Sequence, residues 1–125
     1  MRAMRLALAL ALLPLLAACE GGRDTGGDGQ RVDGDVARGH DLIERYACGA
    51  CHVIPGVHDA NGLVGPPLEG FSRRSYIAGE LPNNAANLQR WLLNPPAVEP
   101  HTAMPNLGLT PDEARDMAAY LSTLR

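Results

Sequence analysis

Apolar residues recur every three or four positions in three parts of this chain, a spacing that predicts three amphipathic α-helices. The first helix follows Asp33 and Asp35, and either residue suits the N-cap position because a carboxylate accepts hydrogen bonds from the first turn. The pattern continues almost to Cys48, so we expect a helix over the stretch before this cysteine. Its predicted buried face comprises Val36, Gly39, Leu42, Ile43 and Tyr46.

The second predicted helix spans residues 84–93 and ends before two consecutive prolines, since proline disfavours helix in the residue before it. Its predicted apolar face is formed by Leu88, Trp91 and Leu92. The third helix begins at Thr110, followed by Pro111 and, three residues after the threonine, by Glu113. This order combines an N-cap threonine, a first-turn proline and the glutamate of a capping box. Its apolar stripe is formed by Ala114, Met117, Ala118 and Leu121.

The segments between these helices are predicted to be loops. Residues 53–70 and 98–109 are rich in glycine and proline, and no stretch shows the alternation of a half-buried strand. The sequence therefore predicts an all-α domain with three main helices and long loops. Loops of this length in so small a domain need a packing partner or a function.

The first 18 residues differ from everything that follows. Two arginines precede an apolar stretch over residues 6–18, which Pro14 interrupts. The stretch is too short to span a bilayer and has the form of a bacterial export signal. It ends in Leu-Ala-Ala followed by Cys19, which resembles a lipobox, where the cysteine is acylated and becomes the mature N-terminus. The alternative is an ordinary small-residue cleavage site beside an incidental cysteine.

The glycine-rich residues after Cys19 predict a flexible tether. We therefore divide the chain into a signal peptide (1–18), a lipidated cysteine with its tether (19–33) and a folded domain (34–125). The expected location is the periplasmic face of a bacterial membrane, or the soluble periplasm if Cys19 is not acylated.

Composition adds that the folded domain is short of core-forming side chains. The first 18 positions hold 15 of the apolar residues, and the whole chain of 125 residues has only five aromatic ones. The length excludes two ordinary domains and a multi-span membrane protein. All 11 basic residues are arginine and 14 residues are acidic, so nucleic acid is not an expected partner. Some group other than a side chain is needed to complete the core.

The candidate for that group comes from Cys48, Cys51 and His52, which form a C-x-x-C-H motif, the attachment pattern of c-type haem. A short turn presents two thiols to the two vinyl groups of one porphyrin, and the next residue places its imidazole under the iron. A dithiol redox motif also uses C-x-x-C, but within a βαβ context that this sequence lacks. A zinc site needs a second ligand pair, and the remaining histidines have no ligand spacing.

A haem iron also needs a sixth ligand or keeps an open site. Met104 is the candidate ligand because it lies in a loop with proline and glycine, whereas the helical register of Met117 places it in the core. His58 and His101 are the alternatives. Histidine–methionine ligation raises the reduction potential and leaves no site for a substrate, which favours electron transfer over catalysis.

These residues together resemble class I cytochrome c over residues 34–124. The resemblance rests on the first helix with its Gly39, the haem motif, the Gly65-Pro66-Pro67-Leu68 loop, the segment around Met104 and the final helix. It implies one covalent haem c, wrapped by the helices and loops of a small all-α fold. It also implies that the first and last helices cross closely, with Gly39 and Ile43 against Met117 and Tyr120.

The resemblance also implies roles for individual residues. The Pro66 carbonyl would accept a hydrogen bond from His52 Nδ1, which makes the imidazole a better donor to iron. Trp91 would lie over the haem near Met104. Arg74, or its neighbour Arg73, would approach the propionates, and so would Tyr76. Because this chain has no lysine, the partner surface of the mitochondrial branch of the family does not carry over.

The sequence thus predicts a monomeric one-electron carrier rather than an enzyme. The expected donors are quinol–cytochrome c reductase or a periplasmic dehydrogenase, and the expected acceptor is a terminal oxidase. Three alternatives remain open: a fixed subunit of a dehydrogenase complex, an open-site haem protein with peroxidase or gas-sensing activity, and a haem-free dithiol oxidoreductase.

Overall fold

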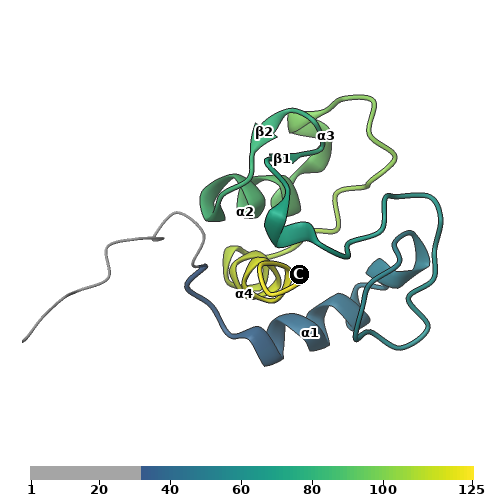
Figure 1. Ribbon diagram of the computed structural model, residues 1–125. Helices are drawn as coiled ribbons and strands as arrows, with labels where there is room; N and C mark the ends of the chain where they lie inside the picture. The colour runs from purple at the N-terminus through teal and green to yellow at the C-terminus, as the bar shows by residue number, and fades with distance from the viewer. Residues whose placement is uncertain (1–31) are drawn as a thin grey trace, which may run out of the picture.

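A computed structural model describes residues 32–125, so the predicted export signal, Cys19 and most of the tether lie outside the described residues. Three longer helices form the body: α1 (Val36–Arg45), α2 (Ala85–Leu93) and α4 (Pro111–Leu121). In Figure 1, α4 is seen nearly end-on, with α1 on one side of it and α2 on the other. The three helices predicted from the sequence are confirmed, and the fold is mostly helical.

Shorter elements complete the fold. They are the 3₁₀ turns η1 (Cys48–Ala50) and η2 (Phe71–Arg73), the strands β1 (Tyr76–Ile77) and β2 (Leu81–Pro82), and the short helix α3 (Pro95–Val98). The strands pair antiparallel, with Ile77 opposite Leu81. The sequence pattern does not predict this hairpin, because two-residue strands are too short to show alternation. Helix α3 was not predicted either. It begins one residue after the end of α2, because proline is well suited to the first turn of a helix.

The predicted caps can be checked atom by atom. Asp35, rather than Asp33, is the N-cap of α1, and its side chain accepts a hydrogen bond from Arg38 N at 3.0 Å. At the start of α4, Thr110 Oγ1 accepts from Glu113 N at 3.2 Å and Glu113 Oε2 accepts from Thr110 N at 3.0 Å. The capping box predicted at Thr110 is therefore present in full.

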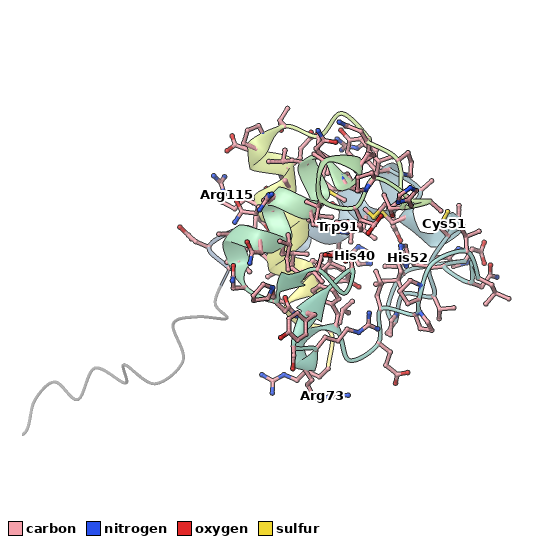
Figure 2. All side chains as sticks on the ribbon, turned by 90° about the horizontal axis from the view of Figure 1, so that it is seen from above. His40, Cys51, His52, Arg73, Trp91 and Arg115 are labelled. Carbon is pink, nitrogen blue, oxygen red and sulfur yellow. The ribbon has the colours of Figure 1, made fainter. Side chains whose placement is uncertain are left out.

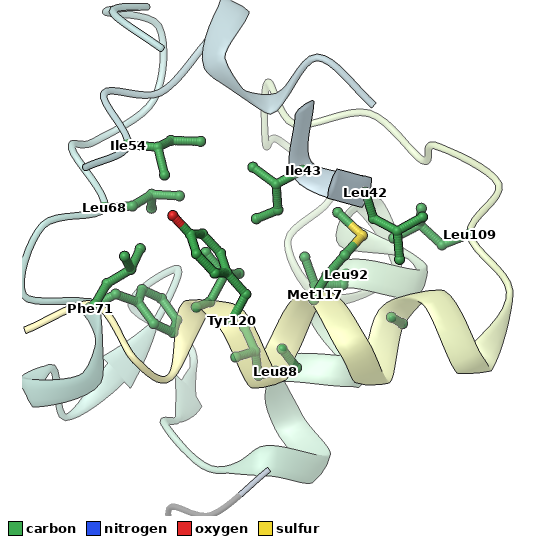
Figure 3. Packing of buried hydrophobic residues seen from close by; sticks show 14 of the residues in the cluster. Leu42, Ile43, Ile54, Leu68, Phe71, Leu88, Leu92, Leu109, Met117 and Tyr120 are labelled. Carbon is green, nitrogen blue, oxygen red and sulfur yellow. The ribbon is translucent and has the colours of Figure 1, made fainter. Parts of the chain in front are cut away.

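The close crossing of α1 and α4 is confirmed, and Gly39 lies at its centre. A Cβ at Gly39 would lie 2.0 Å from the main-chain oxygen of Asp116 and 3.0 Å from Tyr120 Cβ, so only glycine lets the helices approach this closely. Ile43 and Met117 belong to the same buried cluster, as expected. Figure 3 shows this cluster, with Met117 near the centre and Phe71 and Leu68 toward one end.

The buried carboxylate of Asp116 adds a polar tie to this crossing. Asp116 is only 2% exposed, and its Oδ1 accepts a hydrogen bond from Asp35 N at 2.9 Å. Its Oδ2 lies 2.8 Å from Arg38 Nε. A buried charge is tolerated when it is paired in this way. The start of α1 is thereby fixed to the middle of α4.

The loop after His52 is tied to the same two helices. Tyr120 donates its hydroxyl proton to the Pro55 carbonyl at 3.0 Å. His40 Nε2 lies 2.9 Å from the Gly56 carbonyl, and this hydrogen bond is the main cause that raises the pKa of His40. The loop is therefore held against the crossing of α1 and α4. None of the helices within residues 32–125 has the length and apolarity needed to cross a lipid bilayer.

Replacing Gly39 with alanine tests the helix crossing, because an open helix and a close crossing predict opposite changes in the free energy of unfolding. In an open helix this change raises stability by about 1 kcal/mol. At Gly39 the new methyl group meets the Asp116 carbonyl, so we expect the free energy of unfolding to fall by about 2 kcal/mol. Denaturant unfolding of the purified protein measures it.

The exposed position Ala37 of α1 provides the matched control. Ala37→Gly should lower the free energy of unfolding by about 1 kcal/mol, as helix propensity alone requires. A Gly39→Ala variant more stable than the wild type would contradict the close crossing.

Candidate haem site

One large cavity lies beside the crossing of α1 and α4, and residues of the long loops form part of its wall. Its volume is about 420 Å³, within the range of roughly 300–1,000 Å³ that is usual for cofactor sites. Most of the side chains around it are apolar. They come from the end of α1, η1, the loop after His52, η2, β1, α2, the loop around Met104 and α4.

The two thiols of the C-x-x-C-H motif both line this cavity. Ala47 precedes them in the left-handed region with φ 53°, and η1 then turns the chain so that His52 N donates to the Cys48 carbonyl at 3.0 Å. Cys48 and Cys51 are half-buried and form no disulfide with each other. Burial raises the pKa of Cys48 to about 11. A dithiol oxidoreductase depends on a thiol of lowered pKa, whereas burial acts on Cys48 in the opposite direction.

The imidazole of His52 is held in one orientation. His52 Nδ1 donates to the Pro66 carbonyl at 2.7 Å, which leaves Nε2 as the nitrogen free to bind a metal ion. Gly65 lies against the ring, because a Cβ there would lie 2.2 Å from His52 Cε1. The hydrogen bond that the family resemblance implied is therefore present, and Gly65 provides the space for the ring. Figure 2 shows the neighbouring Cys51 and His52.

Met104 lies in the wall contributed by the loop between α3 and α4. It is half-buried, and its N–H donates to Thr102 Oγ1 at 3.1 Å. The alternative ligands do not line the cavity: the side chains of His58 and His101 are 87% and 96% exposed. Met117 is fully buried in α4, as its helical register predicted, although it also borders the cavity.

The three secondary residues lie in different environments. Trp91 is half-buried and lines the cavity from α2. Arg74 also lines it, but its Nη2 donates to the main-chain carbonyls of Pro67 and Glu69, which ties down the loop behind His52. Tyr76 is 58% exposed and is not among the lining residues. The structure thus brings Trp91 and Arg74, but not Tyr76, to the cavity.

Several residues that line the cavity were not predicted from the sequence to do so. Among them are Tyr46, Leu68, Phe71, Ile77 and Glu99. A signal existed for two of them: Tyr46 lies two residues before Cys48, and Phe71 is the only phenylalanine in the chain. The others depend on contacts between distant segments, which no local pattern reports.

The lining residues fit a covalently held haem. Two thiols, one oriented imidazole and one thioether surround a space whose other walls are largely apolar. Zinc is a poorer fit, since residues 32–125 contain no group of three or more His, Cys, Asp and Glu side chains arranged around one point.

Comparison with known proteins gives a consistent result. The sequence model of the family described as cytochrome c matches residues 36–125. Cytochrome c-552 from Bradyrhizobium diazoefficiens is 32% identical over 91 residues, which cover 73% of this chain and 76% of that protein.

Two further relatives are much longer proteins, each named cytochrome c oxidase subunit 2. The one from Alkalihalophilus pseudofirmus is 30% identical over 89 residues, covering 70% of this chain. The one from Bacillus sp. (strain PS3) is 31% identical over 98 residues, covering 75% of this chain. The matched region is 25% and 28% of their lengths, so this chain spans about a quarter of these relatives.

Replacing Gly65 with alanine tests how closely the His52 ring packs against this residue. The new methyl group would overlap the imidazole, so we expect the variant to retain several-fold less covalently bound haem. The pyridine haemochrome assay on protein matured with haem-attachment machinery measures it. Gly79→Ala is the control, because nothing lies within 4 Å of a Cβ there and the change only strains a surface turn. Equal haem content in the two variants would contradict the proposed packing of His52.

Proposed function

The chain belongs to the cytochrome c family, and on this premise we propose that it is a one-electron carrier with one haem c bound through Cys48 and Cys51. His52 Nε2 and Met104 Sδ would be the two axial ligands of the iron. The observation that carries the proposal is that both thiols, the oriented imidazole and the thioether line one largely apolar cavity. Cytochromes c are electron-transfer proteins rather than enzymes.

When bound, haem c supplies an iron that gains and loses a single electron. The residues of this chain hold it and set its surroundings. The hydrogen bond from His52 Nδ1 to the Pro66 carbonyl strengthens the imidazole as a ligand. Leu88, Leu92 and Met117 keep water away from one side of the cavity, and a dry setting disfavours the added positive charge of the oxidised state. With His52 and Met104 both bound to the iron, no position would remain for a substrate.

Electrons would enter and leave near the attachment turn, where the cavity meets the surface. Val64 lines the cavity there, and both Val64 and the adjacent Leu63 are largely exposed. Contiguous exposed apolar side chains can form part of a protein–protein binding surface. The proposed donor is a quinol–cytochrome c reductase or a periplasmic dehydrogenase, and the proposed acceptor is a terminal oxidase. The similarity to two proteins named cytochrome c oxidase subunit 2 supports that acceptor.

The proposed location is the periplasmic face of a bacterial membrane. The support is the sequence: an apolar leader, a lipobox-like Leu-Ala-Ala-Cys19 and the glycine-rich residues after it. Acyl chains on Cys19 would keep the monomeric domain beside membrane partners and raise its effective concentration there.

Removing the proposed sixth ligand is the direct test of this function. Met104→Ala should lower the reduction potential by a substantial part of the roughly 0.8 V that axial ligands control. It should also let the reduced protein bind carbon monoxide, which the wild type should not. Potentiometry and carbon monoxide difference spectra measure the two effects.

Met117→Leu is the matched control, since Met117 also borders the cavity but belongs to the core. Its potential should stay close to that of the wild type. An unchanged potential in Met104→Ala would show that Met104 is not the ligand. Carbon monoxide binding to the wild type would favour an open-site haem protein instead.

Cys19→Ser tests the anchor. The variant should move from the membrane to the soluble fraction, and membranes from cells that express it should oxidise the donor several-fold more slowly. As a control for intrinsic activity, the Cys19→Ser protein is added back to these membranes at the concentration of the wild-type protein, and donor oxidation is measured again. Unchanged membrane oxidation by Cys19→Ser would rule out a role for the tether.

A further inference from the structure

The loop that carries Met104 has few hydrogen bonds to the rest of the domain. Within the described residues, no backbone–backbone hydrogen bond involves residues 103–109. The hydrogen bonds of this loop are local, from Met104 N to Thr102 Oγ1 and from Gly108 N to Asn106 Oδ1. Besides the packing of Leu107 and the buried Leu109, the position of Met104 therefore depends on how the two ends of the loop are fixed.

The downstream end is fixed at Thr110, the N-cap of α4, whose carbonyl accepts from Ala114 N and whose Oγ1 accepts from Glu113 N. One oxygen of the Glu113 carboxylate holds Thr110 as well. Glu113 Oε2 accepts from Thr110 N at 3.0 Å and from Thr110 Oγ1 at 3.1 Å. The same oxygen accepts a third hydrogen bond, from the hydroxyl of Tyr46 at 3.1 Å. Tyr46 is 67 positions away in the sequence, so this is a tertiary contact and not part of the capping box.

Tyr46 belongs to the attachment side of the cavity. It is the C-cap of α1, lies two residues before Cys48 and contributes its half-buried ring to the cavity wall. At the other end of α1 the ties to α4 run through Asp116. Among the side-chain hydrogen bonds of residues 32–125, the Tyr46–Glu113 bond is the one that joins the end of α1 to the start of α4.

The charge states of the pair favour a strong bond near neutral pH. Burial and the neighbouring Glu113 raise the pKa of Tyr46, so its phenol keeps its proton. The Thr110 N–H lowers the pKa of Glu113, so its carboxylate stays ionised. A hydroxyl that donates to a carboxylate makes a charge-assisted hydrogen bond, which is stronger than one between neutral groups.

We propose that Tyr46 and Glu113 are positioning residues that brace the Met104 loop against the haem-attachment end of α1. The brace fixes Thr110, six residues after Met104, and so keeps the thioether at the distance needed to stay on the iron. The inference rests on the proposed axial role of Met104.

Competition with imidazole in the oxidised, haem-loaded protein tests the brace. Imidazole binds the iron only when Met104 has left it, so its apparent Kd reports the detached fraction. The charge-transfer absorption of thioether-ligated ferric haem follows Met104 directly. Tyr46→Phe removes only the hydroxyl, and we expect the apparent Kd for imidazole to fall about tenfold, as the loss of a hydrogen bond to a charged group implies.

Tyr76→Phe is the matched control because Tyr76 also carries a phenol but does not line the cavity. Its apparent Kd for imidazole should equal that of the wild type. In a double-mutant cycle, Glu113→Ala should change this Kd less in the Tyr46→Phe background than in the wild type, because there only the two contacts with Thr110 remain to be lost. Thermal unfolding is followed by far-ultraviolet circular dichroism. A tighter binding of imidazole without a lower unfolding temperature indicates a displaced loop and not a general loss of stability.

Other outcomes would contradict either the brace alone or the axial role of Met104 as well. Unchanged imidazole affinity in Tyr46→Phe, with or without lower thermal stability, overturns the brace and leaves the axial role of Met104 intact. Additive effects in the cycle overturn the brace as well. A wild type that lacks the thioether absorption overturns both the axial role of Met104 and the brace that depends on it.

Discussion

The close approach of α1 and α4 at Gly39 is the constraint on which the other features depend. It sets the direction in which α1 runs, and therefore where Cys48 begins the attachment turn three residues after the helix ends. It also brings Tyr46 to Glu113 and the buried Asp116 to the start of α1. The cavity wall, the loop after His52 and the loop that carries Met104 are all fixed relative to these two helices.

The cavity explains the composition. A chain with 4% aromatic residues has few large side chains to fill a core, yet its buried residues surround a space of about 420 Å³. A covalent porphyrin would fill that space with a flat apolar group, and the long loops would become its walls. Folding and cofactor attachment would then be coupled, because much of the apolar contact is made with the cofactor.

Local patterns predicted the helices and the motif well, because caps and apolar periodicity act over a few residues. The capping box at Thr110 and the helix before Cys48 are examples. Tyr76 could not be placed this way: neighbouring strand residues face opposite sides, and since Ile77 is buried, Tyr76 faces outward. The Tyr46–Glu113 bond joins distant segments, so only the three-dimensional structure reveals it.

The central claim is that the cavity holds one haem attached through both cysteines. The most direct measurement is the intact mass of the purified protein, combined with its pyridine haemochrome spectrum, after maturation with haem-attachment machinery. The account predicts a mass increase of one haem per chain, a spectrum typical of two thioether bonds and no thiol titratable at Cys48 or Cys51. Protein that folds stably with two free thiols and no haem absorption would contradict it.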